Sequence, residues 1–490
     1  MSINSQFQTG SFTHRVAVLK SQSMVEIKLA GQDMVEVVAV CPQLSLSSCE
    51  VSSGRVNYGG RLIVTVVYTD AEGKLCRIQK GAEFSHYADD ERLAPAQRGY
   101  CRLVCEREQV RRDGSGFAVA VVVGAEISVY DSAQRSYLSS IDGAICRTDS
   151  AKLYSMVNFS GESEVEDDFD CVASDVLIPS AQALVLDCNA RAGVVEVSGE
   201  IYLALLAVRD GAPVSLDRII PFKCELLCDE ALLSKRACCS AEVKALNVNC
   251  KVNEERGKCT VDFDATLAFS GHFFEEEEAS CVCDAFCSDS ELNLSFNEEK
   301  TTLDTDIKVY SERVAGPCAA KAKIDYTCAF LAAAMPRAEF ERTPDGAEGS
   351  ITATLLYEQG GEVHSTEVNM PFSVALSGLS DSCRTVSVAV CGMSLRQRAE
   401  GECEGEAVLK ISAADGEEHT VRYVTEATEG APKSACDSAV SVYIPAAGDG
   451  LWETAKRLGE SPESIKLSNP DLSFPLSGNE RILIYRPKHG

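Results

Sequence analysis

Cysteine is the residue type through which this chain could do most chemistry, since it holds 23 cysteines in 490 residues. The tightest groups are Cys281-Val-Cys283 with Cys287, and the adjacent Cys238 and Cys239. Zinc sites typically use Cys-x-x-Cys spacing or histidine partners, which neither group has. We therefore predict no metal at either group, and we expect about four in five of the cysteines to be small buried hydrophobic residues.

Other catalytic patterns are missing from the sequence. There is no Gly-x-x-x-x-Gly-Lys phosphate loop and no Gly-x-Ser-x-Gly nucleophile elbow. The six histidines, at positions 14, 86, 272, 364, 419 and 489, are scattered rather than grouped. We therefore predict that the chain is not an enzyme, has no catalytic residues and uses no cofactor.

The charge of the chain restricts its partners. The formal net charge is −28, and nucleic acid and anionic membrane surfaces would both repel such a chain. From Ala446 onward six acidic residues balance six basic ones, so residues 1–445 carry the whole excess. No run approaches the ~18 apolar residues of a membrane span, and the first residues lack the layout of a signal peptide. We predict no nucleic-acid partner, no membrane span and a cytosolic protein.

The C-terminal segment, residues 442–487, predicts two strands flanking two short helices. Leu451, Trp452, Ala455 and Leu458 recur at helical spacing and give the first helix one apolar face. Gly459 then ends this helix, because glycine readily adopts the left-handed conformation. Since Trp452 shares the apolar face, we expect it in a core.

The second helix of this segment has its own boundary residues. Ser461 can accept hydrogen bonds from the first free amides, and Pro462 has a backbone torsion already suited to helix. Asn469-Pro470 ends the helix, because a residue before proline is disfavoured in helical geometry. Ile482 and Ile484 alternate as in an edge strand.

Internal repetition is the second strong pattern. Apolar runs begin at Gly60, Gly199 and Gly349, and each is followed by a glycine-bearing turn and then a phenylalanine. The turn glycine precedes that phenylalanine, Phe84, Phe222 or Phe372, by 11 residues in every copy. Each copy predicts a β-hairpin.

A lone hairpin is marginal in water, so each copy must recruit further strands. The sequence supplies them downstream, in residues 117–130, 259–269 and 407–412. Copies lie ~140 to ~150 residues apart, which is the size of a domain rather than of a solenoid repeat. We therefore predict three β-sandwich or barrel-like domains in series, with polar boundaries at Glu162–Asp170 and Asn297–Asp306 and a tether at Thr425–Cys436.

The C-terminal pattern resembles the LysM module, which has a strand, a Gly-Asp-Thr-Leu-Trp-type turn, two helices, an Asn-Pro-x-Leu run and a closing strand. The resemblance implies a shallow ligand groove between the first turn and the loop after the second helix. Here Gly450 stands where the family usually has Thr or Ser, which removes a hydroxyl from the groove and makes a protein ligand as plausible as a sugar. The same residues could instead only shape turns. The implied groove residues are Gly448, Asp449, Gly450, Leu451, Asn469, Pro470, Asp471 and Leu472.

Three β-rich repeats followed by a LysM-type module resemble the SPOCS-domain proteins of endospore-forming bacteria. The resemblance implies a mainly β chain with SPOCS-type domains at 1–158, 159–305 and 306–430 and a βααβ LysM module at 440–490. It also implies a non-enzymatic adaptor made in the mother-cell cytoplasm. Such a protein would tether the spore coat to the forespore surface by binding a SpoIVA-like coat morphogenetic ATPase. The alternative is a protein that binds N-acetylglucosamine-containing peptidoglycan through the groove.

Overall fold

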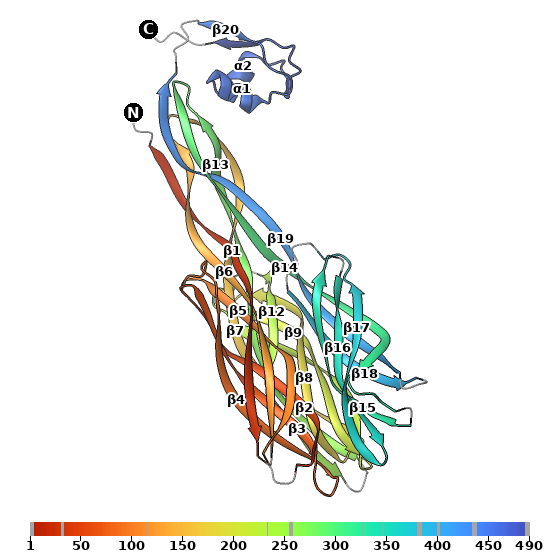
Figure 1. The fold of residues 1–490 in the computed structure, drawn as a ribbon. Helices are drawn as coiled ribbons and strands as arrows, with labels where there is room; N and C mark the ends of the chain where they lie inside the picture. The colour runs from red at the N-terminus through yellow and green to blue at the C-terminus, as the bar shows by residue number, and fades with distance from the viewer. Residues whose placement is uncertain are drawn as a thin grey trace.

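The computed structural model shows a mainly β protein with several sheets and two short helices (Figure 1). Most of the chain forms a broad body that narrows into a stalk, and a small tail module sits at the end of the stalk. The mainly β prediction is confirmed. The structure describes residues 4–30, 34–114, 116–232, 234–253, 258–325, 327–344, 346–379, 385–398, 402–433 and 439–485.

Three repeats with one strand pattern make up the body and stalk. In each, a long first strand pairs antiparallel with a long last strand, and three strands after the first form a meander. The strand before the last also pairs with the last; it is called the fifth strand here, because the short β11 of the second repeat is not counted. The first repeat has β1 (Ser5–Leu29), β2 (Glu36–Ser52), β3 (Arg55–Thr69), β4 (Leu75–Asp89), β5 (Arg98–Asp113) and β6 (Gly116–Ile141). The second has β7 (Ile145–Cys171), β8 (Asp175–Arg191), β9 (Val194–Arg209), β10 (Ala212–Leu227), the short β11 (Lys235–Arg236), β12 (Cys238–Asn253) and β13 (Lys258–Phe286). The third has β14 (Ser290–Ala320), β15 (Ala329–Thr343), β16 (Gly346–Gln359), β17 (Glu362–Ala375), β18 (Thr385–Gln397) and β19 (Cys403–Pro432).

In the first two repeats the meander is a separate sheet that packs against the other strands as a sandwich, whereas in the third repeat β17 also pairs with β14. In the first repeat, Leu62 and Val64 of β3 meet Val119, Val121 and Val123 of β6, and all five are fully buried. Alternate residues along these strands face the core, as the period of a strand requires. The predicted hairpins and the downstream strands at 117–130, 259–269 and 407–412 all lie in observed strands.

The repeated Gly and Phe residues are cross-strand partners. Each glycine that opens an apolar run lies directly opposite the phenylalanine of the returning strand. A Cβ on Gly199 would lie 2.5 Å from the Phe222 ring, so the ring occupies the space that a side chain would fill. The Leu184 carbonyl lies closer still, at 2.1 Å, so the neighbouring strand and the ring together exclude a side chain at Gly199, whereas at Gly349 the close atoms are backbone atoms of Glu339 and Phe340. The three pairs are Gly60–Phe84, Gly199–Phe222 and Gly349–Phe372.

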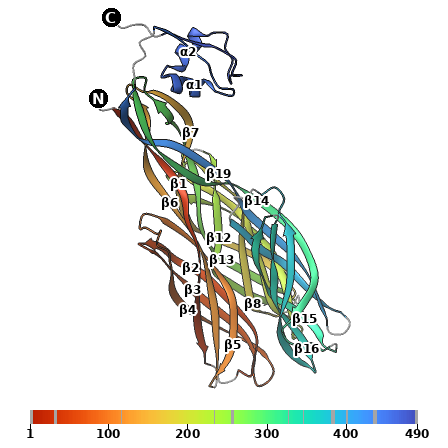
Figure 2. The same cartoon turned by 45° about the horizontal axis from the view of Figure 1, so that its top comes forward.

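The repeats lie side by side rather than in series (Figures 1 and 2). Their second strands meet in one apolar cluster that includes Ala39 of β2, Ile178 of β8 and Ala334 of β15. The sequence predicted a linear arrangement because spacing along the chain reports on repeat size and not on lateral contacts. Burying these apolar edges requires all three repeats to meet.

The stalk consists of the far ends of the three long-strand pairs, β1/β6, β7/β13 and β14/β19 (Figure 1). One apolar cluster joins them, with Phe12, Tyr137, Leu153 and Tyr423 all buried. The Phe12 and Tyr423 rings stack with centroids 5.3 Å apart. Because every repeat contributes side chains to this core, the stalk is a shared structure.

The predicted boundaries fall inside strands. The 158/159 boundary lies in β7 and the 305/306 boundary lies in β14, so each structural repeat begins earlier than expected. The acidic run Glu162–Asp170 alternates exposed and half-buried side chains along β7. Its carboxylates mark the solvent face of a strand and not a linker. The predicted tether is also strand as far as Pro432, and its residues 434–436 lie outside the described residues.

The tail module contains β20 (Val440–Tyr443), α1 (Leu451–Leu458), α2 (Pro462–Ser468) and β21 (Ile482–Tyr485), with β20 and β21 paired antiparallel. Gly459 ends α1 with φ +66°, and the Ser461 hydroxyl accepts the Ser464 amide at 3.0 Å. Both predicted helix boundaries are confirmed. Neither helix in the described part of the chain has the length and apolar character needed to cross a bilayer.

Candidate functional site

The two predicted groove segments come together in the tail module. The Gly448 amide donates to the Leu476 carbonyl at 2.7 Å, and the Leu476 amide donates to the Asp449 carbonyl at 3.0 Å. Leu451 and Leu472 both pack against the tail core. The first turn is therefore bonded to Leu476, further along the loop after α2 than the predicted groove residues 469–472.

Asp449 serves the fold of the first turn. Its carboxylate accepts the Ala446 amide at 3.0 Å and pairs with Arg457 of α1 at 2.7 Å. Only 13% of the Asp449 side chain is exposed. This carboxylate fastens the turn to α1 and has little surface left for a ligand.

Two glycines shape the same turn. Gly448 has φ +90°, a conformation that glycine adopts without the penalty of a side chain. Gly450 precedes α1 and offers no side-chain cap, and a Cβ there would lie 2.3 Å from the Glu453 carboxylate. The Glu453 carboxylate therefore occupies the space that a side chain at position 450 would fill.

Asn469 also serves the fold. Its amide nitrogen donates to the carbonyls of Ile465 at 2.9 Å and Leu483 at 2.8 Å, and its amide oxygen accepts the Leu483 amide at 2.8 Å. These bonds tie the end of α2 to β21 and use most of the hydrogen-bonding capacity of the side chain. Among the neighbouring groove residues, Pro470 and Asp471 are exposed.

Trp452 lies at the junction between tail and stalk. Its indole nitrogen donates to Asp284 of β13 at 2.8 Å, and its ring meets Phe286 edge-on with centroids 5.3 Å apart. Lys456, one turn further along α1, pairs with the same carboxylate at 2.7 Å. Burial raises the pKa of Asp284, but the hydrogen bonds from Lys456 and Trp452 outweigh burial and lower it below its usual value. Trp452 therefore packs against the tail core, as the sequence predicted, and also joins the tail to the stalk.

The outer face of the two-stranded tail sheet is apolar and exposed. Val440 lies opposite Tyr485 and Val442 opposite Leu483, with exposed fractions between 38% and 56%, and Ile444 continues the row at 69%. Figure 1 places β20 on the side of the tail that faces away from the stalk. Sequence analysis missed this surface, although alternation of Val440, Val442 and Ile444 was the available signal.

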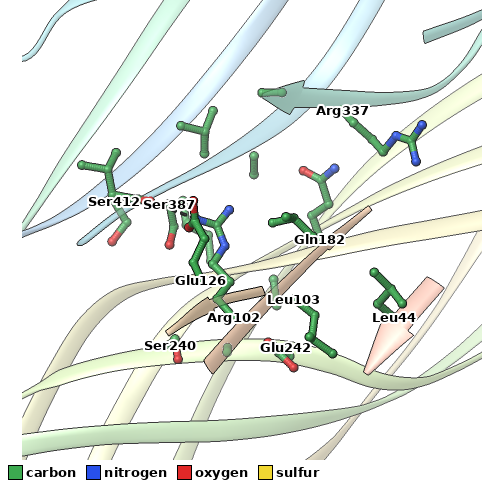
Figure 3. Close-up of a pocket in the computed structure, with 18 of the residues that line it drawn as sticks. Leu44, Arg102, Leu103, Glu126, Gln182, Ser240, Glu242, Arg337, Ser387 and Ser412 are labelled. Atoms are coloured by element: carbon green, nitrogen blue, oxygen red, sulfur yellow. Dashed lines mark hydrogen bonds and ion pairs between the residues drawn. The ribbon is translucent and has the colours of Figure 1, made fainter. Parts of the chain in front are cut away.

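A cavity of about 2100 Å³ lies between the repeats, lined mainly by their second and fifth strands. Figure 3 shows Arg102, Gln182 and Glu242 at its wall. These side chains bond to backbone groups of the neighbouring repeat: Arg102 to the Val386 carbonyl at 3.3 Å, Gln182 to the Val390 amide at 3.2 Å, and Glu242 to the Leu46 amide at 3.4 Å. Burial raises the pKa of Glu242. The polar groups of the cavity wall therefore join repeats to one another.

The cysteine groups show no metal site. In the described residues there is no cluster of three or more histidine, cysteine or carboxylate groups able to hold a metal ion. Cys281 and Cys287 are buried, and Cys283 accepts a hydrogen bond from Arg147 at 3.3 Å. One pair, Cys250–Cys259, is a disulfide between β12 and β13.

No protein-family model, no curated protein and no solved structure matches this chain.

Proposed function

We propose that this chain is a non-enzymatic adaptor in endospore coat assembly, acting in the mother-cell cytoplasm at the forespore surface. In this proposal the three β repeats are SPOCS-type domains and the tail is a LysM module. The tail binds a protein partner, a SpoIVA-like coat morphogenetic ATPase. The stalk separates the tail from the acidic body. The body and tail then connect other coat proteins to that surface.

The observation that carries the proposal is the apolar outer face of β20 and β21. An exposed apolar surface at the tip of a molecule favours association with another protein. The tail is uncharged overall in sequence, while residues 1–445 carry the whole net charge of −28. A neutral, apolar tip on an acidic body supports contact through the tail.

The state of the groove residues also favours a protein over a glycan. Glycan recognition needs free hydrogen-bonding groups, but the side chains of Asp449 and Asn469 are engaged within the tail. Gly450 contributes no hydroxyl to the groove. The exposed Pro470 and Asp471 remain the groove positions through which a sugar could be bound.

The test compares binding of full-length variants to two purified probes, a SpoIVA-like ATPase and peptidoglycan. Replacing both Val442 and Leu483 with Asp places charge on the outer face without touching the tail core. We expect at least a tenfold loss of affinity for the ATPase, which corresponds to about 1.4 kcal/mol. Val18→Asp, at a 53% exposed position of β1, is the matched control and should bind normally.

A groove variant separates the alternative function. Asp471→Lys changes an exposed groove residue and leaves the outer face intact. The adaptor proposal predicts that this variant keeps ATPase binding. Binding of the unchanged protein to peptidoglycan, lost on Asp471→Lys, together with no affinity for the ATPase, would replace the adaptor with a glycan-binding protein.

A further inference from the structure

Two pairs of cysteines occupy equivalent positions in the first and second repeats. The second strands β2 and β8 each have a bulge, after Val37 and after Val176, and Cys49 and Cys188 lie 12 residues beyond those positions. The fifth strands β5 and β12 have bulges after Cys105 and Val243. Cys101 and Cys239 each lie four residues before that bulge. The two pairs therefore match by strand and by register.

In both repeats the paired cysteines face each other across the seam of the sandwich, where the second and fifth strands lie side by side but belong to different sheets. In the first repeat, the Cys49 sulfur lies 3.1 Å from the point where a Cβ on Gly99 would be. β2 and β5 are in close contact along this seam, and each of the Cys49 and Cys101 thiols shifts the pKa of the other. Gly99 thus leaves room for a sulfur between the strands.

The second repeat repeats this contact. The Ala237 amide donates to the Cys188 carbonyl at 3.1 Å, which brings β8 against the start of β12. Two residues further on, the Cys239 thiol donates to the Ser240 carbonyl at 3.4 Å, and the neighbouring Cys188 thiol raises its pKa. Cys188 is buried, whereas Cys101 and Cys239 line the central cavity. A small reagent can therefore approach one sulfur of each pair through the cavity.

We propose that Cys49–Cys101 and Cys188–Cys239 are sites of disulfide formation that lock the second strand to the fifth strand in the first two repeats. The oxidant is a low-molecular-weight disulfide. The bonds span the seam, where the sheet ladders do not join the two strands. Forming these disulfides links the second and fifth strands covalently where they are otherwise held by side-chain packing.

The step balances as thiol–disulfide exchange. One cysteine thiolate attacks the small disulfide, forms a mixed disulfide and releases one small thiolate, which takes up the proton. The partner cysteine then attacks the mixed disulfide, the protein disulfide forms, and the second small thiol leaves. The protein loses two protons and two electrons, and the oxidant is reduced to two thiols.

The third repeat provides an internal contrast. In β15 the bulge follows Phe330, and the position 12 residues beyond Phe330 is Arg342. In β18 the bulge follows Val390, and the position four residues before it is Val386. Neither position equivalent to a seam cysteine therefore holds a cysteine. Its own contacting cysteines, Cys318 and Cys403, lie opposite each other on β14 and β19, which already share a ladder. A seam disulfide is therefore possible only in repeats one and two.

The experiment uses the full-length protein, reduced and then exposed to oxidised glutathione. Remaining thiols are alkylated, and the linked peptides are identified by mass spectrometry without reduction. We expect Cys49 joined to Cys101 and Cys188 joined to Cys239, with Cys250–Cys259 as an internal reference. The thermal midpoint should rise above that of the reduced protein, because a cross-link restricts the unfolded chain.

Two variants make the result decisive. The double variant Cys101→Ser/Cys239→Ser, at the two half-buried seam positions, should lose both seam cross-links and the part of the oxidant-dependent rise in midpoint that Cys250–Cys259 does not supply. Cys76→Ser, in the half-buried part of β4, should keep both cross-links. The proposal fails if the four seam cysteines stay reduced, carry stable glutathione adducts, or join to other cysteines while Cys250–Cys259 forms.

Discussion

At the scale of single residues, Asp284 has the most consequential contacts, because one carboxylate holds the tail to the stalk. It accepts hydrogen bonds from Trp452 and Lys456, both on α1. The ring of Phe286 covers the same contact. Charge-assisted hydrogen bonds of this kind are among the stronger ones. The orientation of the tail, and with it the outer face of β20 and β21, depends on this cluster.

We predict that Asp284→Asn weakens docking of the tail by about 1 to 3 kcal/mol, since it removes an ion pair and a charge-assisted bond. Trp452 is the only tryptophan, so its fluorescence reports on this contact directly. Its emission should move to longer wavelength in the variant, as the indole becomes hydrated. Glu463→Gln, at an exposed position of α2, should leave the emission unchanged.

Acid should have the same effect on the unchanged protein. The pKa of Asp284 in the folded protein lies below the 3.8 of a free aspartate. Its contribution is therefore complete above that value and is lost as the pH falls through the lower folded pKa. The fluorescence shift should appear in this acidic window and be absent from the titration of Asp284→Asn. An identical titration in both proteins would show that another group controls the junction.

At the scale of the elements, the Gly–Phe pairs explain why three distant hairpins share one spacing. A phenylalanine opposite a glycine can lay its ring over the neighbouring strand and fill the sandwich core. Phe222 is buried and also contacts Phe269, with ring centroids 5.8 Å apart. The pairing fixes the register of β9 and β10, because a slip of one residue would turn the ring to the opposite face.

We predict that Phe222→Ala lowers the free energy of unfolding by about 3 to 5 kcal/mol, because it leaves a cavity over Gly199. Urea denaturation followed by circular dichroism measures the change. Phe7→Ala is the matched control, since Phe7 is 55% exposed, and it should change stability by less than about 0.5 kcal/mol. Equal losses in the two variants would mean that the pair has no special role in the core.

At the scale of the whole molecule, the repeats depend on one another. Side chains of one repeat bond to unpaired backbone groups of the next around the central cavity, and an ion pair crosses the same interface. Arg337 of β15 donates to both carboxylate oxygens of Glu108 in β5, at 2.8 and 2.9 Å. The Glu108 side chain is only 17% exposed. This pair links the first repeat to the third.

We predict that Arg337→Met destabilises the body by about 3 kcal/mol, because it leaves a largely buried carboxylate without its partner. Urea denaturation measures this loss, and Arg337→Met combined with Glu108→Leu should recover part of it. The exposed pair Arg398–Glu404, at 2.6 Å, is the control. Arg398→Met should cost less than about 1 kcal/mol. A double variant no more stable than Arg337→Met would contradict this account.

The sequence by itself determined the strand content, the three hairpins and the helix boundaries of the tail, because these follow from local periodicity and from residues such as Gly459 and Ser461. It did not predict that the side chains of Asp449 and Asn469 form hydrogen bonds within the tail. The identity of a polar residue does not show whether its side chain binds a ligand or a backbone group.

Only the tertiary structure decided how the repeats assemble. Ala39, Ile178 and Ala334 read as ordinary strand residues, and nothing in their spacing indicates that they meet in one cluster. The carboxylates of Glu162–Asp170 read as a linker because composition does not distinguish a loop from the solvent face of a strand. Contacts between strands hundreds of residues apart depend on which edges must be buried, and that is decided when the whole chain packs.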